Sequence, residues 1–306
     1  MAKKKLKSSI AISGGTNIIF NILLFVIAAT CIFPLLYVFS VSLSTKESIA
    51  QYGYQIIPKE LTLASYQQIL GSGSSILNAF KNSVILTIVG TLTGSFTIIT
   101  YAYAMSRNDF LYRKFFNTVA FIPMLFGGGM VANYIVMVNV LGLKNTPFAL
   151  LLPLLFNTFY LVIMRTFFQT SVPFALIEAA MVDGANEFDI FFKIVLPISL
   201  PGIATIALFL TLGYWNDWFN AMLYLDDTFS PYATLQYMLI QIQRTIEVVI
   251  LKGDKMGSVA KEALQSLPTD GIRMAIVIVT TFPIALSYPF FQRYFVQGLT
   301  LGAVKE

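Results

Sequence analysis

The sequence has no histidine, one cysteine and few charged side chains. Without histidine it lacks the side chain that most often binds metals or changes charge near neutral pH. One cysteine excludes an intrachain disulfide and a thiolate metal cluster. Charged residues make up 11% of the 306 residues, against roughly 25% in soluble domains. Much of the surface must therefore face something other than water, and no catalytic or metal centre is evident.

Long apolar stretches take the place of charge, and hydrophobic residues make up 57% of the chain. A hydrocarbon core of about 30 Å needs roughly 20 helical residues to cross. Six stretches without Asp, Glu, Lys or Arg reach about that length: 8–45, 82–106, 115–143, 145–164, 194–216 and 274–292. They are apolar on every face, whereas barrel strands alternate. We therefore predict an all-α integral membrane protein with six transmembrane helices in one domain, residues 1–306.

The predicted spans cover about residues 17–43, 82–105, 115–139, 147–168, 199–224 and 272–292. Prolines lie inside several of them, and Gly127–Gly129 interrupts the third. Such breaks survive in a membrane when neighbouring helices or a water-filled path satisfy the freed backbone groups. They fit a conduit, although proline and glycine are common in any membrane helix.

The placement of lysine and arginine predicts the orientation. Four lysines precede the first span, and Arg107, Arg113 and Lys114 follow the second, whereas the short loop after the third carries only Lys144. Cytoplasmic loops are enriched in these residues. We expect both termini in the cytoplasm of a bacterial cell, with the chain crossing its membrane several times. A lipoprotein signal ending at Cys31 is the less favoured alternative, because the apolar run continues beyond it.

Three hydrophilic segments are longer than connectors need to be: outer loops 44–81 and 225–270, and an inner loop 170–197. In the inner loop, Ile177, Ala180 and Met181 stand at helical spacing, Gly184 is a helix stop, and Asn186 can open a second short helix. A compact pair of helices facing the cytoplasm suits a docking surface. The alternative is an amphipathic helix resting on lipid, which the acidic side chains of this loop disfavour.

Three strings carry a family resemblance. The inner loop reads Glu-Ala-Ala at 178–180, glycine at 184 and Ile-x-Leu-Pro at 194–197. The fifth predicted span ends in Trp-Asn-Asp-Trp at 215–218, and the chain ends in QGLTLGAVKE at 297–306. Together they resemble the EAA-motif permease subunits of binding-protein-dependent ABC importers, specifically the MalG- and LplC-like carbohydrate branch. In that family the fold has six transmembrane helices of the type I importer kind, with a cytoplasmic coupling helix between helices 4 and 5.

The resemblance implies that the inner loop docks on an ATP-binding subunit. Glu178 would pair with a basic residue there, Ala179 and Ala180 would pack closely, and Gly184 would make the turn; Asp183 offers a further charged anchor. The chain has no G-x4-G-K-[ST] phosphate loop of its own. We expect no cofactor on this chain, ATP and Mg²⁺ on separate ATPase subunits, and no enzymatic activity of its own.

A candidate substrate path combines aromatic and polar side chains. Trp215 and Trp218, three apart, are expected to share a helix face on which sugar rings could stack, or to form an interfacial belt. Asp217 is the stronger indication, since a carboxylate at membrane depth normally faces a bundle interior or a water-filled cavity. The full set is Trp215, Asn216, Asp217, Trp218, Asn157 and Tyr160. The last two could equally bond neighbouring helices.

The sequence thus predicts the permease subunit of an ABC importer for a sugar, expected to be an oligosaccharide. Its partners would be a second homologous permease subunit, two ATP-binding-cassette ATPase subunits, an extracellular solute-binding protein and the lipid membrane, with no nucleic acid. A secondary transporter would need a coupling-ion site and repeated halves. A membrane-embedded enzyme would need clustered acidic residues or histidines near a membrane face. An ABC permease for a non-sugar solute also stays open.

Overall fold

The computed structural model describes residues 14–71, 74–226, 230–252 and 269–302. The N-terminal lysines and the last four residues of the C-terminal string lie outside these ranges. The described parts are helical without a named strand, and one isolated bridge pairs Ser44 with Leu61. They fall into two compact units, drawn from residues 1–69 with 257–279 and from residues 70–256 with 280–306. Whether the units form the single domain that we expect stays a prediction.

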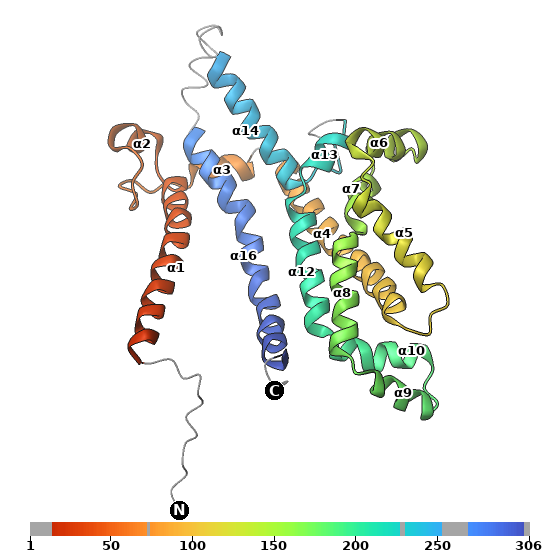
Figure 1. Cartoon of the computed structure of the whole chain (residues 1–306). Helices are drawn as coiled ribbons and strands as arrows, with labels where there is room; N and C mark the ends of the chain where they lie inside the picture. The colour runs from red at the N-terminus through yellow and green to blue at the C-terminus, as the bar shows by residue number, and fades with distance from the viewer. Residues whose placement is uncertain (1–13, 72–73, 227–229, 253–268, 303–306) are drawn as a thin grey trace, which may run out of the picture. The chain divides into compact units, whose positions relative to one another are not determined.

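The α-helices of the described residues are α1 (Gly14–Ser42), α2 (Lys46–Tyr52), α3 (Ala64–Gly71), α4 (Ser74–Ser106), α5 (Arg113–Leu125), α6 (Gly129–Ile135), α7 (Pro147–Leu155), α8 (Thr158–Ser171), α9 (Phe174–Val182), α10 (Glu187–Asp189), α11 (Leu196–Ile198), α12 (Leu200–Asn216), α13 (Phe219–Tyr224), α14 (Leu235–Lys252) and α16 (Thr269–Gly302). Two π-helical segments, η1 (Val136–Val140) and η2 (Ile190–Val195), join them. Figure 1 labels most of these helices.

Three helices are long and apolar enough to cross a membrane alone: Gly15–Ser42 of α1, Ser75–Ser106 of α4 and Asp270–Tyr294 of α16. The apolar window of α1 has no buried residue within the structure. Its side chains, such as Phe25 at 73% exposure, are therefore free to face lipid or another chain.

Three more spans arise only from helix pairs that bend at a short break. These pairs are Arg113–Leu125 with Gly129–Val140 (116°), Pro147–Leu155 with Thr158–Ser171 (47°) and Glu187–Ile198 with Leu200–Asn216 (79°). If each pair is counted as one span, the described residues hold up to six membrane-crossing segments, as the apolar runs predict.

The structure corrects the continuity of several predicted segments. The expected span over 115–139 is not one helix, because the chain turns by 116° around Gly127–Gly129, where Gly129 has a φ of +76°. The expected span over 199–224 breaks between Asn216 and Phe219. Part of the outer loop 225–270 is helical, since residues 235–252 form helix α14.

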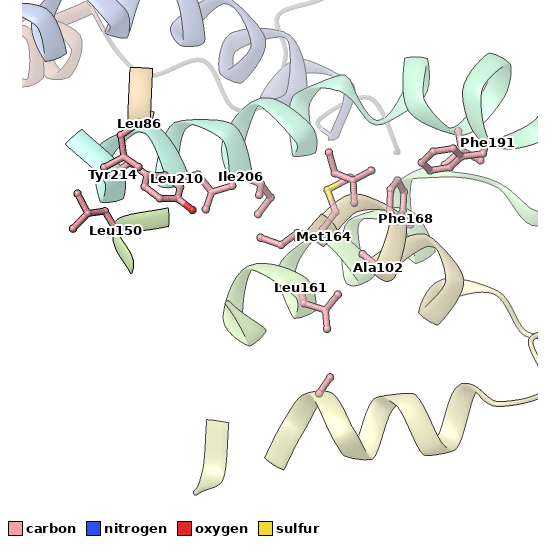
Figure 2. Close-up of a cluster of buried hydrophobic side chains, with 14 of the residues drawn as sticks. Leu86, Ala102, Leu150, Leu161, Met164, Phe168, Phe191, Ile206, Leu210 and Tyr214 are labelled. Carbon is pink, nitrogen blue, oxygen red and sulfur yellow. The ribbon is translucent and has the colours of Figure 1, made fainter. Parts of the chain in front are cut away.

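The core of the larger unit lies around α4, which packs against α12, α8, α7 and α14. Figure 2 shows the buried side chains that fill the space between these helices and η2. Its labelled members are Leu86 and Ala102 of α4, Leu150 of α7, Leu161, Met164 and Phe168 of α8, Phe191 of η2, and Ile206, Leu210 and Tyr214 of α12.

Glycine sets the distance between α4 and α12. A Cβ built on Gly90 would overlap the ring of Tyr214, and one on Gly94 would stand 3.1 Å from Leu210. The four-residue spacing of these two glycines is the small-xxx-small pattern that lets membrane helices approach closely. The Tyr214 hydroxyl also donates a hydrogen bond to the Leu151 carbonyl of α7 at 2.8 Å, which fixes the position of the ring.

We predict that Gly90→Ala destabilises the protein, because the added methyl group has no space beside the Tyr214 ring. Overpacking of this kind costs about 1–3 kcal/mol. Thermal unfolding in detergent measures the effect. The matched control is Gly213→Ala in α12, where a Cβ meets nothing within 4 Å and should be tolerated. Equal melting temperatures for the two variants would contradict the close-approach argument.

Candidate coupling loop and substrate path

The first helix of the inner loop, α9, is ended by local backbone bonds. Gly184 has a φ of +82°, a conformation that favours glycine. Its N–H donates to the Met181 carbonyl at 3.0 Å, and the Ala185 N–H donates to the Ala180 carbonyl at 2.9 Å. This pair of bonds is the Schellman motif. The prediction that Gly184 stops this helix is confirmed.

The second short helix starts where the sequence predicts. The Asn186 side-chain oxygen accepts a hydrogen bond from the Asp189 N–H at 2.9 Å, which caps the start of α10. The chain then continues as the π-helical segment η2. The turn between α9 and α10 is thus formed by the glycine that ends the first helix and the asparagine that caps the second.

The loop presents a mixed face to its surroundings. Ile177 is buried, and Ala180 is half-buried, whereas Glu178, Ala179 and Asp183 are exposed. Exposed apolar side chains accompany them, with Val182 at 86% and Phe188 at 76% exposure. Within the larger unit the loop lies at the end opposite α13 (Figure 1). The five residues expected to dock an ATPase therefore lie together, and four of them, including Gly184 at the turn, are exposed.

The inner side of the loop is tied to α4 by contacts that the sequence reasoning missed. Arg107 Nη2 donates to Glu187 Oε1 at 2.9 Å, and the Tyr103 hydroxyl donates to Glu187 Oε2 at 2.8 Å. The only sequence signal for this contact was the four-residue spacing of a tyrosine and an arginine at the end of an apolar run. Nothing local indicated their partner 80 residues later.

A cavity of about 360 Å³ lies behind α9. It is lined by residues from the end of α4, the end of α8 and the first turn of α9, among them Arg107, Phe168 and Ile177. The loop is therefore not packed tightly against the helix ends on this side.

At the candidate substrate path, the expectation that Trp215 and Trp218 share one helix face is wrong. Helix α12 ends at Asn216, and Asp217 has extended backbone angles of φ −76° and ψ 98°. Trp215 is 5% exposed, its ring contacts Phe80 edge-on at 6.0 Å, and its Nε1 donates to the Thr280 carbonyl at 3.1 Å. Trp215 is therefore a packing residue, whereas Trp218 is only half-buried.

Asp217 and Asn216 form the break itself. Asp217 Oδ1 accepts from the Asn220 N–H at 3.1 Å, and Oδ2 accepts from Asn220 Nδ2 at 2.8 Å, which caps α13. Asn216 Nδ2 donates to the Leu212 carbonyl at 2.9 Å. The carboxylate is thus satisfied within its own turn, and Asn216 is exposed.

The remaining two candidates have local partners as well. Asn157 caps α8, since its Oδ1 accepts from the Phe159 N–H at 2.9 Å. The Tyr160 ring stacks on Phe209 of α12, with ring centroids 5.5 Å apart and 20° between the planes. Asn157 is exposed and Tyr160 half-buried. Neither is brought next to the 215–218 segment by a contact in the described residues.

Helix α14 supplies two neighbours of the path that sequence reasoning did not single out. Gln236 Nε2 donates to Asn216 Oδ1 at 3.3 Å, and the Arg244 guanidinium carbon lies 5.9 Å from the centre of the Trp218 ring. Gln236 and Arg244 are eight residues apart on α14. A helical reading of residues 235–252 would have placed them on the same side.

No group of three His, Cys, Asp or Glu that could hold a metal occurs in the ranges that the structure describes. The expectation that this chain carries no cofactor stays a prediction.

Comparison with known proteins identifies a family model. Residues 94–301 match the model of the binding-protein-dependent transport system inner membrane component. LplC of Bacillus subtilis is 37% identical over 279 residues, covering 91% of each chain. The polygalacturonan/rhamnogalacturonan transport system permease protein YtcP of the same organism is also 37% identical, over 94% of this chain and 99% of YtcP.

A solved structure has the same fold. It belongs to a bacterial ABC transporter involved in the import of the acidic polysaccharide alginate. Its chain superposes with a TM-score of 0.78 and 28% identity, covering 93% of this chain and 99% of that one.

Because the two tryptophans have different surroundings, we predict that replacing each by alanine lowers the stability of the protein by a different amount. Trp215→Ala should destabilise by about 3 kcal/mol or more, because it empties a buried site beside Phe80 and Thr280. Trp218→Ala should cost clearly less, since that ring is already partly exposed. Thermal unfolding of both variants in the same detergent decides. A larger loss for Trp218→Ala would be incompatible with these positions.

Proposed function

Since the chain belongs to the family of inner membrane components of binding-protein-dependent transport systems, we propose that it is the permease subunit through which an ABC importer translocates an oligosaccharide. Members of this family are channel components of the membrane and not enzymes. The all-helical structure with several apolar helices is that of a type I permease. The sugar is supported by the names of YtcP and of the alginate transporter, both of which concern polysaccharides.

The inner loop carries the proposal that this chain couples ATP hydrolysis to transport. The supporting observation is that Glu178, Ala179 and Asp183 are exposed on one short helix that Gly184 ends abruptly. In our proposal Glu178 pairs with a basic residue of an ATPase subunit, and Ala179 and Ala180 allow its surface to approach the backbone. The loop then faces the cytoplasm, as do both termini.

The proposed assembly has a second, homologous permease subunit, two ATPase subunits that bind ATP and Mg²⁺, and an extracellular solute-binding protein. The exposed apolar surface of α1 supports a membrane environment shared with another chain. Closure of the ATPase subunits on ATP would favour one arrangement of the helices, and hydrolysis would favour the other, which is a population shift between two states.

For the solute path we propose the exposed side of the break after α12. Trp218 supplies a ring for stacking on a sugar, and Asn216 an amide for its hydroxyl groups. Asp217 then acts by shaping the break and Trp215 by packing. Asn157 and Tyr160 stay candidates on α8, with roles that no contact to the 215–218 segment supports.

Affinity purification of this chain from its native membrane in mild detergent, followed by mass spectrometry, tests the assembly. We expect a second six-span chain and an ATP-binding protein to come with it. Recovery of the chain alone, or as a homo-oligomer without an ATPase, would falsify the importer assignment and favour a secondary transporter.

Glu178→Lys tests the docking residue. Reversing the charge against a basic partner should leave the chain in the membrane but separate ATP hydrolysis from uptake, measured as uptake per ATP hydrolysed in proteoliposomes. The control is Glu247→Lys, which makes the same charge change at an exposed position of α14. Helix α14 lies at the end of the unit opposite α9 (Figure 1). Unchanged uptake per ATP in Glu178→Lys would show that this carboxylate does not dock the ATPase.

A further inference from the structure

Two side chains at the end of α4 hold both oxygens of a single carboxylate in the inner loop. Tyr103 lies in the last turn of α4, and Arg107 directly follows the last residue of the helix, Ser106. The Tyr103 hydroxyl donates to Glu187 Oε2 at 2.8 Å, and Arg107 Nη2 donates to Glu187 Oε1 at 2.9 Å. We refer to Tyr103, Arg107 and Glu187 as the α4 clasp.

Arg107 is fixed in place within the clasp. It is 6% exposed, and Asp109 accepts from its Nε at 3.0 Å and from its Nη2 at 2.8 Å, a two-point contact. Its Nη1 is buried without an acceptor in the structure. A buried guanidinium keeps its charge and therefore favours carboxylate partners. Glu187, whose side chain is 55% exposed, is the carboxylate that the inner loop supplies to Arg107.

The ring of Tyr103 joins the clasp to the neighbouring helices. It lies 4.8 Å from the ring of Phe191 in η2 and 6.2 Å, edge-on, from that of Phe168 in α8. One residue of α4 thus contacts both the last part of the inner loop, η2, and the helix that precedes the loop, α8. The cavity of about 360 Å³ behind α9 leaves the loop room to shift against these contacts.

We propose that the α4 clasp transmits the movement of the coupling loop to α4, and through α4 to α12. This proposal rests on the proposed function, because it assumes that ATPase subunits move the loop. It divides the loop into two sides. Glu178 docks the partner, whereas Glu187, which is exposed but bonded to Arg107 and Tyr103, passes the movement to the helix bundle. Tyr103, Arg107 and Glu187 are positioning residues.

Hydrogen–deuterium exchange of the purified complex with its ATPase subunits tests this transmission directly. Exchange is compared between the nucleotide-free complex and the complex trapped with ATP and orthovanadate. In the wild type, trapping should change the exchange of amides 101–109 together with that of loop residues 174–189. In Glu187→Ala the loop should still respond, while amides 101–109 should no longer do so.

The control is Asn108→Ala, which removes an exposed contact to Arg113 Nη1 at the same end of α4 and leaves the clasp intact. It should respond to trapping as the wild type does. A residue that merely supports the fold would alter exchange in both states alike, so only a nucleotide-dependent loss supports transmission. The proposal is overturned if amides 101–109 respond equally in Glu187→Ala and the wild type, or do not respond in the wild type.

If Glu187→Ala fails to assemble, the same exchange measurement is made on Tyr103→Phe. This variant keeps the ring against Phe191 and removes only the hydroxyl that bonds to Glu187. A weaker response of amides 101–109 supports the clasp, and a wild-type response overturns it. A wild-type preparation that contains no ATPase subunit contradicts the proposed function and is recognised before any exchange is measured.

Discussion

The backbone of α4 at Gly90 lies against the Tyr214 ring of α12 with no space for a side chain, and the packing of the larger unit depends on this approach. In a membrane, lipid tails are as apolar as leucine, so helices associate through close contact and interhelical hydrogen bonds. Tyr214 supplies both, since its ring fits the glycine and its hydroxyl bonds to the Leu151 carbonyl of α7. A larger residue at 90 would separate three helices at once.

Helix α4 holds a functional segment at each of its ends. Near its start, Asn82 Nδ2 donates to the carbonyls of Pro231 at 2.7 Å and Ala233 at 3.0 Å, and Ser83 accepts from the Leu235 N–H. These bonds position the beginning of α14, which reaches the proposed solute path. Near its end, the α4 clasp holds the inner loop. One rigid helix of 33 residues therefore connects the two regions that an importer has to coordinate.

In our proposals the inner loop separates docking from transmission over few residues. The Schellman motif at Gly184 and the Asn186 cap turn the chain between Glu178 and Glu187. Glu178 is exposed, whereas Glu187 pairs with the buried Arg107 at the end of α4 and keeps 55% of its own side chain exposed. On this difference we assign docking to Glu178 and transmission to Glu187.

The sequence by itself determined the membrane nature of the protein, its helical class, and the two short helices of the inner loop, with the stop at Gly184 and the start at Asn186. These depend on run length and on turn chemistry, which act within a few residues. It did not reveal α14, whose mixed composition looked like a loop, or the break at Asp217 that separates the two tryptophans. Only the tertiary structure decided that Tyr103 and Arg107 meet Glu187, because a contact between helices 80 residues apart leaves no periodic signal in either segment.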